Sequence, residues 1–170
     1  MKSLLITVLL SMSLWAITIG EIPKNTTIEG DNGGMVEGDG AWNSSSIKDK
    51  VYVMFYVDPD EKDTNEHFSN ALKAKEYDRS NYGSIAIVNL GATWKPNFII
   101  EKILKSKQEK FPHTIYVKDK EKVLVNAWDI GDDASNILIF SKDSKLLFYK
   151  SGKMEEDDMK KAFSLIEANI

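Results

Sequence analysis

The hydrophobic and polar positions of this chain alternate in blocks that predict strands and helices in turn. Residues 51–57 form an unbroken apolar run of strand-forming residues, which predicts a central strand covered on both faces. The polar turn 58–60 ends this run, and a helix capped by Thr64 or Asn65 is predicted to extend to about Tyr77. This order is the first half of a strand–helix–strand unit.

The pattern continues with a second buried strand at residues 84–90. After Pro96 a helix is predicted to run to about Glu109, and a third strand follows at residues 113–117. Four apolar residues of this helix are spaced as one face and are predicted to pack on the core: Phe98, Ile99, Ile103 and Leu104. Strands that alternate with helices at this spacing indicate right-handed crossovers and parallel strand pairs.

The last third of the chain predicts a different arrangement. Residues 123–128 fit either a short helix or an extended segment. Residues 137–141 and 145–149 predict two strands joined by a tight turn, which makes this pair antiparallel. Residues 155–168 predict an amphipathic helix with an acidic start, which suits the helix dipole. The chain is therefore expected to form an α/β fold with a mixed sheet.

Residues 1–20 predict a signal peptide for export. Lys2 precedes a segment, residues 4–19, that is largely apolar, and the chain becomes polar from Glu21. This segment is shorter than the about 20 residues that a membrane-spanning helix needs. Cleavage is expected near Gly20, with Thr18 at the third position before the cut.

The remainder of the chain divides into two parts. Residues 21–46 are rich in glycine, asparagine and aspartate, and predict turns with at most a short hairpin that carries Met35 and Val36. Residues 47–170 contain all of the longer predicted elements and are expected to form one folded domain.

Composition and charge exclude several classes of function. The formal net charge is −4, which disfavours nucleic acid and anionic lipid as partners because both are bound through lysine and arginine. We therefore expect neither a nucleic-acid partner nor a membrane partner after the signal is removed. The sequence contains no cysteine, which excludes disulfides, thiolate nucleophiles and cysteine-based metal sites. No cofactor is predicted.

The order of the elements resembles the thioredoxin-like fold, and two segments, 111–119 and 137–149, resemble peroxiredoxin-related chains. The chain is also similar to the YtfJ-like family of exported bacterial proteins through several short motifs, which are Trp42-Asn43-Ser44, Ile87-Val88-Asn89, Ala127-Trp128 and Lys150-Ser151-Gly152. The resemblance implies a three-layer α/β/α domain with a mixed central sheet, and a periplasmic location. It brings no established catalytic residues, so we assign none.

The thioredoxin-like resemblance places working cysteines in the turn after the first central strand. Residues 58–65 occupy that place here and hold four carboxylates instead of thiols. The proline that usually precedes the later strand is also missing, because residues 133–136 read Asp-Ala-Ser-Asn. Both differences predict a protein without thiol–disulfide or peroxidase activity.

Two hypotheses follow for the function. The first is a redox-inactive domain that binds another envelope protein through loops at the carboxyl ends of the strands, where open α/β sheets bind ligands. The candidate binding face comprises Asp58, Asp60, Asp63, His67, Trp94, Asp129, Asp132 and Asp133. The alternative is a metal-dependent or acid–base enzyme that uses the acidic turn from Asp58 to Asp63 together with His67. The acids also fit a simpler role in capping the helix, and no metal site is assigned.

Overall fold

The structure is a computed structural model of the 170-residue chain, and it describes residues 16–170. Most of the predicted signal peptide therefore lies outside the described residues. A six-stranded mixed sheet forms the centre of the molecule, in the order β2-β6-β5-β4-β7-β8. Its strands are β2 (Gly33–Met35), β4 (Val51–Val57), β5 (Tyr82–Asn89), β6 (Thr114–Asp119), β7 (Ser135–Phe140) and β8 (Leu146–Ser151).

The prediction of an inner strand at residues 51–57 is confirmed by β4, which pairs in parallel with β5 and antiparallel with β7. Alternate residues of β4 enter two different cores. Val51 and Val53 pack in the core on one face of the sheet, and Met54 and Tyr56 pack in the core on the other. The apolar run is continuous because both of its faces are buried.

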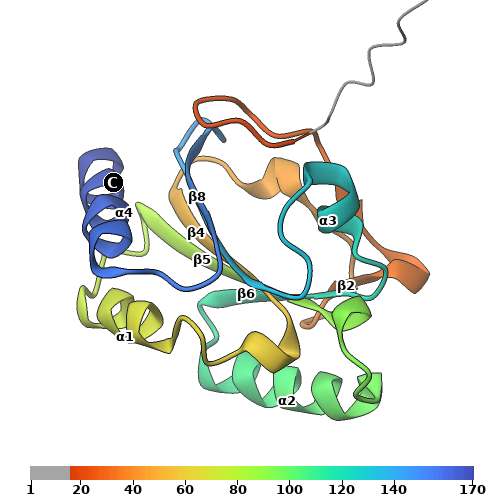
Figure 1. Ribbon diagram of the computed structural model, residues 1–170. Coiled ribbons are helices and arrows are strands. Elements are labelled where there is room, and N and C mark those ends of the chain that lie inside the picture. Colours follow the sequence, from red (N-terminus) through yellow and green to blue (C-terminus); the bar gives the residue numbers. More distant parts are fainter. Residues whose placement is uncertain (1–15) are drawn as a thin grey trace, which may run out of the picture.

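The helices form layers on both sides of the sheet, as predicted (Figure 1). Three helices cover one face of the sheet with their buried residues: α1 (Glu66–Ala74), α2 (Asn97–Lys110) and α4 (Glu156–Asn169). The buried residues of α3 (Val123–Trp128) pack against the other face. Two right-handed crossovers, β4-α1-β5 and β5-α2-β6, place α1 and α2 on the same face because the three strands lie in consecutive order.

Two helices differ from the prediction. The helix α1 ends at Ala74 rather than near Tyr77, and Glu76 then adopts a left-handed conformation with φ of 48°. In α2 the buried residues are Ile100 and Leu104, whereas Phe98, Ile99 and Ile103 are exposed. The predicted apolar stripe of α2 was therefore wrong in three of its four members, because Ile100 and Leu104 form the face that meets Tyr116 and Leu90.

The glycine-rich segment contributes directly to the sheet. The strand β2 carries Met35, as predicted, but it pairs with β6 from the middle of the chain rather than within a local hairpin. A Cβ atom on Gly33 would lie 1.9 Å from the carbonyl oxygen of Lys118, so only glycine permits this close pairing. A second, two-stranded sheet joins β1 (Thr27–Ile28) to β3 (Trp42–Asn43), and buries Ile28 and Trp42 in the core.

The C-terminal elements match the prediction closely. The strands β7 and β8 are antiparallel, and residues 123–128 form the helix α3. Glu155 and Asp158 form a capping box at the start of α4, in which the Glu155 backbone N–H donates to Asp158 Oδ2 at 3.1 Å. Four short 3₁₀ helices complete the described residues: Gly30–Asn32, Ser44–Ser46, Pro59–Glu61 and Leu90–Ala92.

Candidate functional site

The carboxyl ends of β4, β5 and β6 meet at one edge of the sheet, and β7 begins there. Because β4, β5 and β6 are parallel, the residues that follow them are brought together although they lie far apart in sequence. The loops at this edge hold Asp58, Asn89 and Asp119 at the strand ends, and Asp132 before β7. We call this group of loops the carboxyl edge.

Asp58 is the first residue of the turn that follows β4. Its side chain accepts a hydrogen bond from the Asp60 backbone N–H at 2.8 Å and caps the short helix that follows β4. Its own backbone N–H donates to the carbonyl oxygen of Ala134, which holds the two loops together. Asp58 is 5 % exposed, and burial raises its pKa above the ordinary value.

A first polar contact joins the acidic turn to the loop after β5. Asp60 accepts hydrogen bonds from Lys95 and, at 2.9 Å, from the Thr93 hydroxyl. These two bonds lower the pKa of Asp60, with the bond from Lys95 having the larger effect. The turn and the loop therefore form one surface.

A second polar contact joins β5, α3 and the loop before β7. Asp132 Oδ2 lies 2.5 Å from Lys122 Nζ, and Asp132 Oδ1 accepts from Asn89 Nδ2 at 3.0 Å. Burial alone would raise the pKa of Asp132, but the hydrogen bonds from Lys122, Asn89 and the backbone of Asp133 outweigh it and lower the pKa. The same ion pair raises the pKa of Lys122.

The loop before β7 is held by Asn136, which is fully buried. Its Nδ2 donates to the carbonyl oxygen of Gly131 at 2.8 Å, and its Oδ1 accepts from the Gly131 N–H at 3.1 Å and from the Tyr149 hydroxyl at 3.1 Å. An asparagine side chain thus fixes the loop that precedes this strand. The buried amide of Asn136 therefore joins Gly131 in this loop to Tyr149 on β8.

The remaining predicted residues do not gather at one point. Asp63 pairs with its neighbour Lys62 and is exposed, and Asp129 ends α3 in a left-handed conformation. The Nε2 atom of His67 lies 2.8 Å from the carbonyl oxygen of Met154, at the start of α4, so its ring is engaged away from the acidic turn. Within residues 16–170 no three histidine, aspartate or glutamate side chains are placed to hold a metal ion.

Trp94 lies beside the carboxyl edge and is 87 % exposed. The exposed apolar residues of α2 continue from it, with Phe98 72 %, Ile103 51 % and Ile99 45 % exposed. Four exposed lysines on α2 make no ion pair with any described residue: Lys102, Lys105, Lys107 and Lys110. We call these eight residues the α2 surface.

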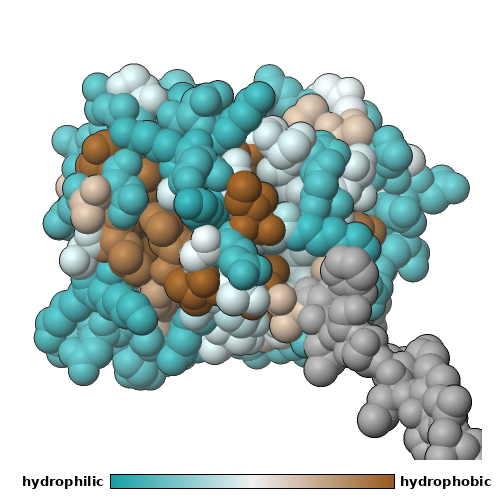
Figure 2. Space-filling model, turned by 90° about the horizontal axis from the view of Figure 1, so that it is seen from above, coloured by the Kyte–Doolittle hydropathy of each residue, from teal (hydrophilic) through white to brown (hydrophobic). Residues whose placement is uncertain are grey.

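The end of the molecule opposite α2 has a different surface. Figure 2 looks down on that end, where hydrophobic residues gather in one patch among mostly hydrophilic ones.

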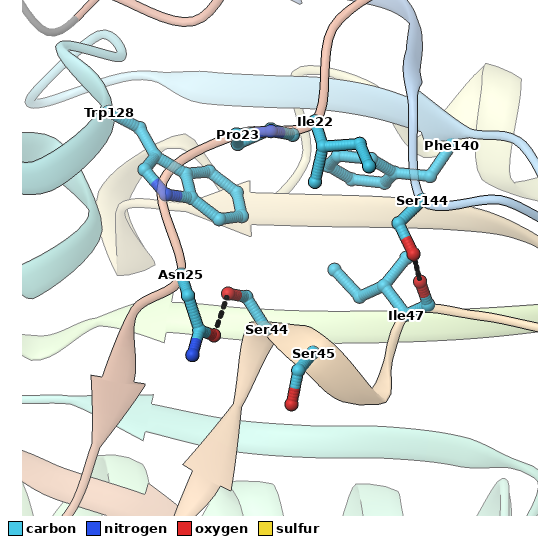
Figure 3. Close-up of a pocket in the computed structure, with 9 residues that line it drawn as sticks. All are labelled: Ile22, Pro23, Asn25, Ser44, Ser45, Ile47, Trp128, Phe140 and Ser144. Atoms are coloured by element: carbon cyan, nitrogen blue, oxygen red, sulfur yellow. Dashed lines mark hydrogen bonds between the residues drawn. The ribbon is translucent and has the colours of Figure 1, made fainter.

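A shallow cavity of about 160 Å³ lies on the α3 side of the sheet, and Figure 3 shows Trp128, Ile22 and Phe140 among its walls. Two of its polar side chains make hydrogen bonds: Ser44 donates to Asn25 and Ser144 donates to the backbone of Ile47.

Sequence reasoning missed the residues that connect the site. The candidate binding face predicted from the sequence does not include Asn89 or Lys122. Asn89 lies near the end of a predicted strand, and Lys122 lies just before residues 123–128. Asp119 was also missed; it is fully buried and accepts hydrogen bonds from the Tyr56 hydroxyl and from the backbone N–H groups of Val123 and Leu124. The available signal was its position directly after a buried strand.

The fold defines a thioredoxin-like domain, and its carboxyl edge holds carboxylates and no cysteine. The family described as "Bacterial protein of unknown function (YtfJ_HI0045)" matches residues 35–169, and the chain belongs to it. An uncharacterized protein of Haemophilus influenzae is 27 % identical over 129 residues, which cover 74 % of this chain and 70 % of that protein. The uncharacterized protein YtfJ of Escherichia coli is 22 % identical over the same shares of both chains.

Solved structures support the same fold. A proposed thiol:disulfide interchange protein DsbE from Chlorobium tepidum has a TM-score of 0.61 at 12 % identity, and the match covers 91 % of this chain and 99 % of that one. A thiol-disulfide isomerase from Corynebacterium glutamicum has a TM-score of 0.58 at 14 % identity, covering 83 % and 93 %. At these identities the likeness shows the fold alone.

Proposed function

We propose that this protein acts in the periplasm as a non-redox docking domain, which binds an envelope protein through the α2 surface and the adjoining carboxyl edge. The observation that carries the proposal is the exposure of Trp94 and Phe98 beside a site that contains no cysteine. Large exposed aromatic residues at the centre of a surface patch are typical of binding interfaces.

The charge of the α2 surface indicates the chemistry of the partner. The chain as a whole is acidic, but α2 holds four lysines and two glutamates and is therefore locally basic. The partner surface that complements it has an apolar centre and an acidic rim. The carboxyl edge adds paired charges, such as Asp60 with Lys95, which give orientation rather than affinity.

The export part of the proposal rests on the amino-terminal pattern and on the family resemblance. Within residues 16–170 the structure contains no helix that is both long and apolar enough to cross a bilayer. Cell fractionation tests the location directly. Recovery of the chain in the cytoplasm would contradict a periplasmic role.

The docking face is tested by capture of partners from envelope extract on the immobilised protein, followed by reconstitution with the purified partner. The double variant Trp94→Ala/Phe98→Ala is expected to weaken binding at least about tenfold, because central aromatic residues dominate interface energies. Charge reversal by Lys102→Glu and Lys105→Glu should slow association and reduce its salt dependence.

Two control variants make this test specific. Ile170→Ala removes an exposed apolar residue at the end of α4, and Lys160→Glu reverses an exposed charge on the same helix. Both should bind the partner like the wild type. A partner that binds the Trp94→Ala/Phe98→Ala variant with unchanged affinity would show that the α2 surface is not the docking face.

A further inference from the structure

Residues 17–21 form an ordered part of the folded domain. The Ile17 backbone N–H donates to the carbonyl oxygen of Trp128 at 3.1 Å, and the Ile17 side chain packs against the core that contains Trp128. The Gly20 N–H donates to the carbonyl oxygen of Leu146 at 2.7 Å, and the Leu146 N–H donates to the Glu21 carbonyl oxygen at 2.9 Å. These contacts join the segment to α3 and to the first residue of β8.

The same residues form a tight turn. The Glu21 N–H donates to the Thr18 carbonyl oxygen at 3.2 Å, and Gly20 has a φ of 89° at the third position of the turn, which favours glycine. A cut after Gly20 would sever this turn and leave the carbonyl oxygens of Trp128 and Leu146 without their donors. Loss of residues 17–20 would therefore remove two backbone hydrogen bonds and the contact of Ile17 with the core, and would weaken the fold.

From these contacts we infer that the signal peptide is removed on the N-terminal side of Ile17, so that residues 17–20 stay in the mature chain. The inference rests on the proposed export. The sequence supplies a suitable bond between Ser13 and Leu14, because Ser11 and Ser13 are small residues at the third and first positions before it. Residues 4–10, apolar apart from Thr7, still provide a hydrophobic region of sufficient length.

The test is to express the full chain with its own signal, recover it from the periplasmic fraction, and determine its first residue by N-terminal sequencing and intact mass. We expect Leu14, and any newly formed N-terminus up to and including Ile17 supports the inference. A mature chain that starts at Thr18 or later overturns it, as does an exported chain that still carries Met1. Retention in the cytoplasm would instead overturn the proposed location, and the inference with it.

A matched pair of variants tests the choice of bond. Ser13→Leu places a large side chain next to the inferred bond and should leave most of the chain as the unprocessed precursor. Thr18→Leu makes the same kind of change at an exposed position inside the folded segment, and should be processed as fast as the wild type. Normal processing of Ser13→Leu together with blocked processing of Thr18→Leu would overturn the inference.

Discussion

Lys122 Nζ lies 2.5 Å from Asp132 Oδ2, and this ion pair joins the start of α3 to the loop before β7. Asn89 binds the other oxygen of Asp132 from the end of β5. The ends of three segments are thereby fixed at the carboxyl edge. The carboxyl edge is thus held together by polar side-chain contacts.

Substitution of Lys122 should change the titration of Asp132. The pKa of Asp132 is lowered in the folded protein, so its ionised form contributes stability above the unfolded pKa, and this contribution is lost as pH falls through the folded pKa. In Lys122→Gln the pKa of Asp132 should rise, and the loss of stability on acidification should become smaller. NMR titration of the Asp132 carboxyl carbon measures the shift, and an unchanged pKa would contradict the assignment.

Asp58 should show the opposite dependence on pH. Burial raises its pKa, so its contribution to stability is fully present below the unfolded pKa and is lost as pH rises through the folded pKa. Asp58→Asn keeps an acceptor for the Asp60 N–H and removes the buried charge, so at neutral pH it should be at least as stable as the wild type. Asp58→Ala loses the cap and should be less stable by about 1 kcal/mol. Thermal unfolding of both variants checks the difference.

Removal of the Asp119 carboxylate should strongly lower the free energy of unfolding. Asp119→Ala leaves the Tyr56 hydroxyl and the backbone N–H groups at the start of α3 without an acceptor in a buried place, at a cost of about 3 kcal/mol. Tyr56→Phe removes only one of these donors and should cost about 1 kcal/mol. Urea denaturation gives both values. Equal effects of the two substitutions would show that Asp119 does not organise α3.

Gly33 should not tolerate a side chain. In Gly33→Ala the added Cβ would overlap the Lys118 carbonyl oxygen, so β2 must leave β6 and the free energy of unfolding should fall by about 3 kcal/mol. Gly38→Ala is the matched control, because Gly38 also has a positive φ, of 75°, but no atom lies within 4 Å of the added Cβ. This control should cost about 1 kcal/mol, from backbone strain alone.

The sequence predicts where helices and strands form better than it predicts which face of a helix is buried. The run from Val51 to Val57 is buried on both sides, and its continuous apolar pattern can be read without knowledge of its neighbours. On α2, by contrast, Ile99 with Ile103 and Ile100 with Leu104 have the same helical spacing, so periodicity cannot decide which pair meets the sheet. The loop after β5 sets the rotation of the helix, and that rotation is a tertiary property.

The candidate site shows the same limit. The acidic residues of the turn after β4 were identified because carboxylates stand out in a local pattern. The partners Lys95 and Lys122 come from other loops, and their pairing with Asp60 and Asp132 depends on strand order. Similarly, a glycine at position 33 is compatible with a turn and with a close approach of two backbones. Only the pairing of β2 with β6 shows that the close approach is the reason for this glycine.

The contacts of Gly20 and Glu21 with Leu146 lie on the outer edge of β8, the last strand of the sheet. Open strand edges recruit strands from other molecules and promote aggregation. The opposite edge is formed by β2, which is only three residues long and offers little length for such pairing. Gly20 and Glu21 therefore occupy the backbone groups of Leu146 at one end of this edge, and make them unavailable to a strand from another molecule.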